Sequence, residues 1–412
     1  MLDKAIQNGF NKELHIKTKK GGTIAFGIYD ILLFLCVTFT ALMVRYALRN
    51  VVADDYTIFF EPWVATLREA GGGIRGLNAH FDYVDYTTPY LFILSCISIC
   101  PFLNSLFLMK LVSVLFDFSA AVAVMFLVYH EKKNTTLSIA AYGCLLLAPT
   151  IVANSSMWAQ CDIIFTSFVM WSVYFILKDK PVCAMIFYGA AFAFKLQTFF
   201  VLPLFVILWM KGRVKAKHFL FVPLMYLVGI IPGLIAGQNF LDLIGVYVMQ
   251  ADGKMDIYAL SHKFPNIYQL VGTDTFLIEY ADAGVWLALG ALMILMYTFA
   301  RKQYELTDGL ILQMAMLLTM TVVFFLPHMH ERYAVLVDVL AIAYAFCRPR
   351  KFYIPVLMIL SSFAGYSIYL AKQTILPMCV YTLFFVYVMF VLGTDIYREM
   401  NGNSAVTTGT AE

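Results

Sequence analysis

The chain has 412 residues, of which 61% are hydrophobic and only 13% are charged. A soluble domain carries roughly 25% charged residues, so this composition excludes an ordinary soluble protein. The net charge of +3 is too small to indicate a nucleic-acid partner. The composition therefore predicts an integral membrane protein whose apolar surface is covered by lipid.

About 20 apolar residues cross a bilayer as a helix. The sequence contains about twelve candidate stretches, of which two, 182–194 and 334–347, are short. The candidates lie at about residues 24–48, 105–129, 136–154, 162–177, 182–194, 197–210, 218–236, 283–300, 309–327, 334–347, 353–370 and 376–393. The sequence therefore predicts a single all-α, polytopic transmembrane domain over residues 1–412, with a disordered polar tail at 402–412.

The basic residues predict the orientation of these helices, because cytoplasmic loops are enriched in Lys and Arg. With the N-terminus inside, 19 of the 29 Lys and Arg residues fall in inner segments. Nine fall in outer segments, and Lys110 lies within the second helix. We therefore expect a multi-pass protein of the cell membrane with both termini in the cytoplasm.

Two outer loops are long, at about 49–104 and 237–282. The first contains an amphipathic stretch, 59–68, that ends at three glycines, which is typical of a helix followed by a stop. It also contains an apolar stretch, 89–101, that is too short to cross a bilayer comfortably and is bracketed by prolines. We expect both stretches to be helices at the outer membrane interface.

Charged residues at bilayer depth are costly and tend to be functional. Asp54 and Asp55 follow the first helix, where a carboxylate can take a proton from an attacking hydroxyl. Either Asp can instead cap the following helix, since Asp favours that position. Asp162 follows Trp158 and Gln160 at the outer mouth of two helices, and it too can act at a site or cap a helix.

Two further polar groups lie at outer helix ends. Lys195 and Gln197 lie at a hairpin, where a lysine either pairs with a lipid phosphate or extends to the interface. Arg332 follows His330 and Glu331, and its planar guanidinium suits a phosphate if it is not simply a loop residue. The His spacing is a weak metal signal, so we expect no metal or other cofactor.

Three other acidic residues, Asp30, Asp117 and Asp338, lie inside predicted helices. We expect them to be buried against polar partners.

The order of these motifs resembles that of the bacterial GT-C glycosyltransferases, in particular those related to the enzyme that adds the second mannose to GPI anchors. The resemblance extends over about 24–395 and is carried by Asp55-Tyr56, Phe59-x-x-Pro62-Trp63, Asp85-Tyr86-Thr87-Thr88-Pro89-Tyr90, Trp158-Ala159-Gln160-Cys161-Asp162, Phe194-Lys195-Leu196-Gln197 and Met329-His330-Glu331-Arg332-Tyr333.

The resemblance implies a GT-C fold whose first outer loop folds into interfacial helices over the active site. It implies a polyprenyl-phosphate sugar as donor, inversion of the anomeric centre, and a catalytic carboxylate at Asp55. We expect Asp55, or Asp54, to be the base. We expect the donor phosphate to be bound by Lys195, Arg332, His330 and Gln197, and the sugar or acceptor by Trp158, Gln160, Asp162, Asp85, Tyr86 and Glu331.

The predicted activity is the extracytoplasmic transfer of a hexose to a cell-surface glycan, a teichoic-type polymer or a lipid-linked acceptor. One alternative is a ligase or polymerase for lipid-linked saccharides, although the outer basic residues are scattered. Another is a sugar-lipid transporter, although no internal repeat is evident. The third is a non-catalytic protein that binds sugar-lipids.

Overall fold

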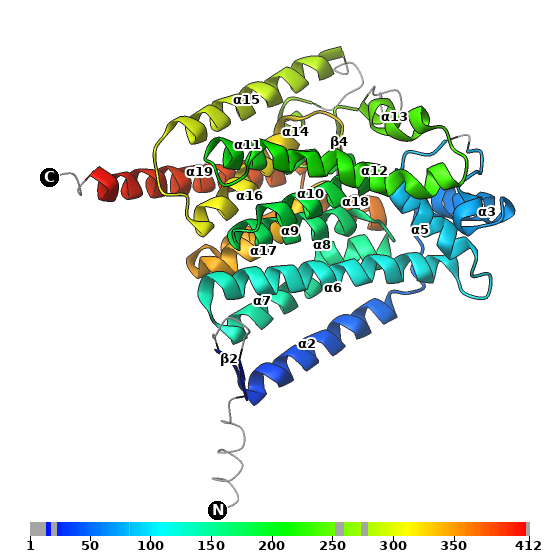
Figure 1. The fold of residues 1–412 in the computed structure, drawn as a ribbon, viewed down its shortest axis with the longest axis horizontal. Helices are drawn as coiled ribbons and strands as arrows, with labels where there is room; N and C mark the ends of the chain where they lie inside the picture. Colours follow the sequence, from blue (N-terminus) through cyan, green and yellow to red (C-terminus); the bar gives the residue numbers. More distant parts are fainter. Residues whose placement is uncertain (1–13, 18–22, 82, 252–258, 273–278, 409–412) are drawn as a thin grey trace, which may run out of the picture.

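The structure is a computed structural model that describes residues 14–17, 23–81, 83–251, 259–272 and 279–408 (Figure 1). The chain is almost entirely helical. Two small sheets accompany the helices. Strand β1 (Leu14–Lys17) pairs antiparallel with β2 (Thr23–Phe26), and β3 (Ser261–His262) pairs in parallel with β4 (Met329–His330).

Seven of the described helices are long and apolar enough to cross a bilayer. They are α2 (Ile28–Ala47), α6 (Ser105–Lys132), α12 (Phe221–Ile235, extended by the 3-10 turn from Ala216), α15 (Ala281–Arg301), α16 (Asp308–Phe325), α18 (Tyr353–Ala371, extended from Pro349) and α19 (Met378–Thr408). The prediction of an all-α, polytopic membrane protein is thereby confirmed.

An eighth candidate span is broken. Helix α7 (Thr135–Leu147) meets α8 (Pro149–Val152) and the π-helical turn Ala153–Met157 at a bend of 48°. Pro149 explains the break, because proline cannot donate the helical hydrogen bond and disfavours a helical residue before it.

Shorter apolar helices fill most of the remaining sequence. They are α5 (Thr88–Ser98), α9 (Asp162–Leu177), α10 (Pro181–Phe194), α11 (Leu202–Met210, preceded by the 3-10 turn Leu196–Val201), α13 (Phe240–Ala251) and α17 (Val335–Cys347). Each of the twelve apolar stretches predicted from the sequence therefore coincides with a helix. Several of these helices are too short to span a bilayer unaided.

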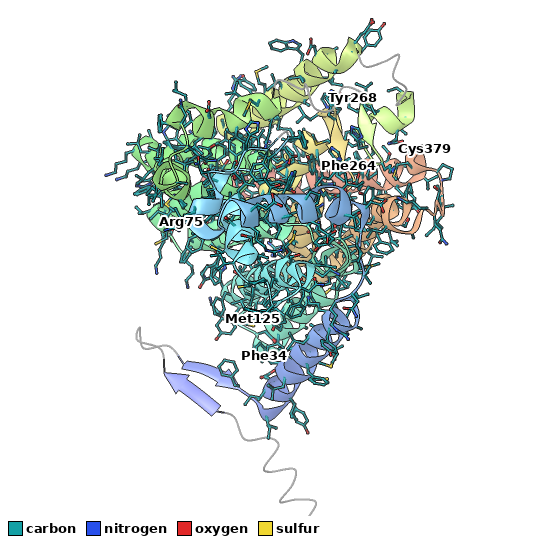
Figure 2. The ribbon with its side chains drawn as sticks, turned by 90° about the vertical axis from the view of Figure 1, so that its right-hand side faces the viewer. Phe34, Arg75, Met125, Phe264, Tyr268 and Cys379 are labelled. Atoms are coloured by element: carbon teal, nitrogen blue, oxygen red, sulfur yellow. The ribbon has the colours of Figure 1, made fainter. Side chains whose placement is uncertain are left out.

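The segment from about 49 to 104, which follows α2, folds into short helices, as predicted. The π-helical turn Tyr56–Phe60 continues into α3 (Glu61–Glu69), and α4 (Gly73–Gly76) follows. Gly71, Gly72 and Gly73 all have positive φ, from 55° to 102°, a conformation that glycine adopts without strain. These helices and α5 lie together at one end of the molecule (Figure 1), which Figure 2 views end-on with Arg75 of α4 labelled.

Helix α17 is the centre of the bundle, because every residue from Val335 to Cys347 is buried. The three acidic residues expected to be buried against polar partners have them. The Asp30 carboxylate accepts a hydrogen bond from Thr136 at 2.6 Å, and that of Asp338 accepts one from Ser362 at 2.9 Å. Asp117 pairs with Arg45 at 2.7 Å and thereby links α6 to α2.

The last helix is longer than the sequence predicts. Hydropathy ends the apolar stretch at about 393, and a disordered tail is expected from 402, whereas α19 continues to Thr408. Residues 409–412 of that tail lie outside the described residues, as do 252–258 and 273–278 of the second long loop.

Candidate functional site

Five segments that are distant in sequence meet near the end of the bundle that carries α3 and α5. They are the start of the π-helical turn at Asp55, the turn Trp158–Asp162, the α10–α11 hairpin at Lys195, the strand β4 with the residues that follow it, and the end of α18. Most of the residues singled out from the sequence lie in this cluster.

Three side-chain donors hold the carboxylate of Asp55. Its Oδ2 accepts hydrogen bonds from Trp158 Nε1 at 2.9 Å and from Gln160 Nε2 at 2.6 Å. Its Oδ1 accepts one from the hydroxyl of Tyr369. An ionised carboxylate has about four acceptor positions, so three donors fix its orientation and leave about one position open. The side chain retains 16% of its exposure, so a hydroxyl group can reach it.

The chain leading to Asp55 is fixed by helix α6. The ammonium of Lys110 donates to the carbonyls of Leu48 at 2.9 Å and Val51 at 2.5 Å, just beyond the C-terminal end of α2. A cation is favourable there because the helix dipole is negative at that end. The hydroxyl of Tyr56 bonds with that of Ser105 at 2.7 Å, which anchors the other side of Asp55 to α6.

Asp54 points away from this cluster. Its side chain is 61% exposed and pairs with Lys372 at 3.0 Å, on the short connection that follows α18. Asp55 makes no side-chain capping hydrogen bond to the helix that it precedes. Of the two neighbouring carboxylates, Asp55 is therefore the one held beside the cations of the cluster.

The turn that presents Trp158 and Gln160 is unusual. Ala159 between them has φ of +62°, a left-handed conformation that is costly for a residue with a Cβ. The indole of Trp158 is fully buried and stacks on the ring of Tyr369, with centroids 4.2 Å apart. Gln160 is also buried, and its Oε1 accepts a hydrogen bond from Tyr86 at 3.4 Å. Both side chains orient Asp55 and have little surface for any other contact.

Asp162 lies beneath the cations as a buried counter-charge. Its side chain is fully buried and accepts hydrogen bonds from the ammonium of Lys195 and from Asn154 Nδ2, the latter at 3.1 Å. Arg332 Nε lies 3.6 Å from its second oxygen. The start of α9 has no side-chain cap. A carboxylate this deeply buried needs such partners, because an unpaired charge there is strongly destabilising.

The guanidinium of Arg332 lies between the carboxylates of Asp162 and Asp55. Its Nη1 lies 4.0 Å from Asp55 Oδ2 and 3.4 Å from Glu331 Oε1, and its guanidinium lies over the ring of Trp158. Burial disfavours the charged guanidinium, but Asp162 and Glu331 outweigh that effect and raise the pKa of Arg332 well above its usual value. For Lys195, burial is likewise outweighed, chiefly by Asp162, and the pKa is raised. Both side chains therefore stay cationic.

Asp85 is a half-buried carboxyl near the same cations. Its backbone carbonyl accepts a hydrogen bond from Gln250 in α13. Burial raises the pKa of the Asp85 carboxyl, and the charges of Arg332, Lys195 and His330 oppose this only in part. The segment between α2 and α6 thus contributes a second carboxyl, one that protonates more readily than an exposed Asp.

The second long loop reaches the site through the pairing of β3 with β4. This pairing stacks the ring of His262 on that of His330, with centroids 4.5 Å apart. His330 Nδ1 lies 3.9 Å from a carboxylate oxygen of Glu331, which is itself buried. Within the described residues, no group of three or more His, Cys, Asp or Glu side chains is placed to hold a metal ion.

The structure does not join Gln197 to this network. It lies on the 3-10 turn after Lys195, and among the described residues its buried Oε1 has no hydrogen-bond partner.

Sequence reasoning missed Tyr369 and Asn154. Asn154 is a polar residue inside an apolar stretch, which is a signal in itself. Tyr369 gives no such signal, because a tyrosine near the end of a membrane helix is ordinary.

The apolar helices and this polar cluster together define an all-α, multi-pass membrane protein with a buried network of acids and cations near one end of its bundle. No protein-family model matches the chain, and no curated protein matches it.

Proposed function

We propose that the protein is a GT-C glycosyltransferase that transfers a hexose from a polyprenyl-phosphate sugar to a cell-surface glycan, a teichoic-type polymer or a lipid-linked acceptor. The observation that carries the proposal is the arrangement around Asp55. Its carboxylate is oriented by three donors, is open to one more, and lies 4.0 Å from a guanidinium. A base beside a cation is what a displacement with an anionic leaving group requires.

In the proposed reaction, the carboxylate of Asp55 takes the proton of an acceptor hydroxyl as that oxygen attacks the anomeric carbon. The bond from that carbon to the phosphate oxygen breaks, and its electron pair stays with the leaving lipid phosphate. A single displacement of this kind inverts the anomeric centre. The three donors to Asp55 contribute by holding the base in the geometry for attack.

Arg332 is best placed to stabilise the leaving phosphate. Among the described residues its ionic contacts use Nε and Nη1 and leave Nη2 available. Lys195 supplies a second positive charge, although one of its protons is engaged by Asp162. Asp162 thus serves to position both cations, and the imidazole of His330 would contact the same phosphate.

The charge balance of the site bears on donor binding. Asp55, Asp162 and Glu331 provide three negative charges against the two of Lys195 and Arg332. A donor phosphodiester would add another negative charge. Burial raises the pKa of Asp85, and the negative charge of a bound donor would raise it further; we propose that this carboxyl contacts sugar hydroxyls.

We further propose that the shorter helices complete about twelve spans. Helix α17, with 13 residues, is about 20 Å long and would not cross a core of roughly 30 Å alone. It is enclosed by other helices, so its ends need not meet lipid. On the basis of the positive-inside distribution, we propose that both termini lie in the cytoplasm and that the site of Asp55 lies on the outer face.

The reaction class can be tested with purified protein in liposomes, a panel of radiolabelled polyprenyl-phosphate hexoses and a membrane glycan acceptor. Transfer of label to the acceptor from one donor, but not from the matching nucleotide sugar, would support the proposal and identify the sugar. Transfer of a whole lipid-linked oligosaccharide would indicate a ligase. Movement of labelled lipid across the bilayer without transfer would indicate a transporter.

A further inference from the structure

A cavity lined by several basic side chains lies at the opposite end of the bundle from Asp55. Helix α17 begins just after Arg332 and ends at Cys347, and α18 returns over 19 residues, about 28 Å, from Tyr353 to Ala371, two residues beyond Tyr369. The cavity lies between the turn that joins α17 to α18 and the C-terminal part of α19. Its volume is about 590 Å³, within the range of roughly 300–1,000 Å³ typical of ligand sites. Five basic side chains line this basic cavity: Lys132, Arg348, Arg350, Lys351 and Arg398.

The acids around the basic cavity already have partners. Lys351 pairs with Asp395 at 2.6 Å, and Arg348 pairs with Glu131 at 3.0 Å. The carboxylate of Glu399 accepts hydrogen bonds from Thr307 and from Gln313.

The remaining three basic side chains, Lys132, Arg350 and Arg398, make no ion pair or hydrogen bond with the described part of the chain. With the neighbouring Glu131 counted, five cations face three carboxylates. The cavity is therefore positively charged and open to an anion.

Gln313 indicates that the ligand carries a hydrogen-bond donor, which a simple anion lacks. Its side chain is 2% exposed and lines the basic cavity, and its Nε2 donates to Glu399 at 2.8 Å. Among the described residues, its buried Oε1 has no hydrogen-bond partner. Buried acceptors are normally satisfied, so the ligand is expected to bring a donor such as a hydroxyl.

An apolar groove adjoins the basic cavity. Phe390, Gly393, Thr394 and Tyr397 line a hollow of about 290 Å³ on α19, and Arg398 lines both spaces. Gly393 keeps the groove open, since a Cβ there would meet no atom within 4 Å. Phe390 and Tyr397 are 69% and 60% exposed, which suits contact with an acyl chain.

We propose that the basic cavity binds an anionic glycerophospholipid whose headgroup carries hydroxyl groups, such as phosphatidylglycerol. Its phosphodiester lies among Lys132, Arg350 and Arg398. A glycerol hydroxyl donates to Gln313, and an acyl chain follows the groove at Gly393. Basic clusters between membrane helices recognise anionic headgroups in this way. The site is independent of the reaction proposed at Asp55.

Native mass spectrometry of the purified full-length protein with added phosphatidylglycerol tests the site. Wild type is expected to retain the lipid. The double variant Arg350→Gln/Arg398→Gln should bind it about 30-fold more weakly, at about a fivefold loss for each basic residue. Both residues are exposed and unpaired within the described chain, so folding should be preserved.

A matched control is Lys215→Gln/Lys217→Gln. These exposed residues precede α12 on a loop that contacts Asp308 at the same end through Arg213. The control removes the same charge outside the basic cavity and should not change binding. An equal loss in both double variants would show that only general surface charge attracts the lipid, and would overturn the proposal.

Two further comparisons separate the lipid from a soluble phosphate. Phosphatidylethanol has the same charge without headgroup hydroxyls and should bind more weakly, whereas equal binding would overturn the contact with Gln313. Gly393→Leu should fill the groove and weaken the binding of phosphatidylglycerol without changing the binding of inorganic phosphate. Displacement of the lipid by millimolar inorganic phosphate, with no effect of Gly393→Leu, would show a soluble-anion site instead.

Discussion

The hydroxyl of Tyr369 gives the sharpest test of how Asp55 is held. It donates to Asp55 Oδ1, while its ring stacks on Trp158, whose indole donates to Oδ2. The substitution Tyr369→Phe removes the hydroxyl and keeps the ring. A hydrogen bond to a charged group contributes about 1.5–3 kcal/mol. If that contribution serves to orient the base, kcat should fall about 10- to 150-fold.

The assay is steady-state transfer from the donor identified by the lipid panel, with kcat and KM determined separately. KM for the donor should change little, because Tyr369 bonds to Oδ1 of Asp55, whereas Arg332 lies beside Oδ2. The matched control is Tyr268→Phe, whose hydroxyl donates to the carbonyl of Phe325 at 2.7 Å. It should cost about 1 kcal/mol of stability and leave kcat unchanged. A Tyr369→Phe variant with normal kcat, or one that loses kcat only in step with its thermal stability, would refute the reasoning.

Three further predictions concern the charged network. Arg332→Lys should reduce transfer at least tenfold, because a point charge cannot face Asp162, Asp55 and a phosphate together; full activity would argue against a fork contact. Lys195→Ala should destabilise the protein by up to about 3–5 kcal/mol, because the buried Asp162 loses its ammonium partner and keeps only Asn154 and the more distant Arg332, and it should weaken donor binding. Adding Asp162→Asn should restore the melting temperature but not the donor KM, and recovery of both would limit Lys195 to a structural role. Burial raises the pKa of Asp85 above 3.8, so its stabilising contribution is complete below about pH 3.8 and is lost as pH rises through the raised pKa. Thermal unfolding between pH 4 and 7 should show a shallower loss of stability in Asp85→Asn, and an unchanged slope would contradict the burial of that carboxyl.

The fold was largely predictable because lipid imposes one simple rule on sequence. Apolar stretches become helices, and the twelve found by hydropathy, such as 162–177, coincide with helices such as Asp162–Leu177. Helix length was less predictable at the C-terminal end, where the helix continues to Thr408 beyond the apolar stretch. Hydropathy also does not decide whether a helix of 13 residues, such as α17, crosses the bilayer, since that depends on what surrounds it.

The site was predictable in its members but not in their contacts. Their position at the ends of apolar stretches identified Asp55, Asp162 and Arg332. Spacing left the alternative that each Asp caps a helix, and the structure has no such cap at Asp55 or at the start of α9. The different positions of Asp54 and Asp55 follow from tertiary contacts with Lys372 and Gln160, which no local pattern encodes.

The comparison of Asp55→Asn with Asp54→Asn tests the central claim most directly. Both variants remove one negative charge from neighbouring positions, and only Asp55 lies beside Arg332. Single-turnover transfer should be abolished in Asp55→Asn, with donor binding retained, and should be close to wild type in Asp54→Asn. Normal transfer by Asp55→Asn, or loss of transfer in Asp54→Asn alone, would contradict the assignment of Asp55 as the base.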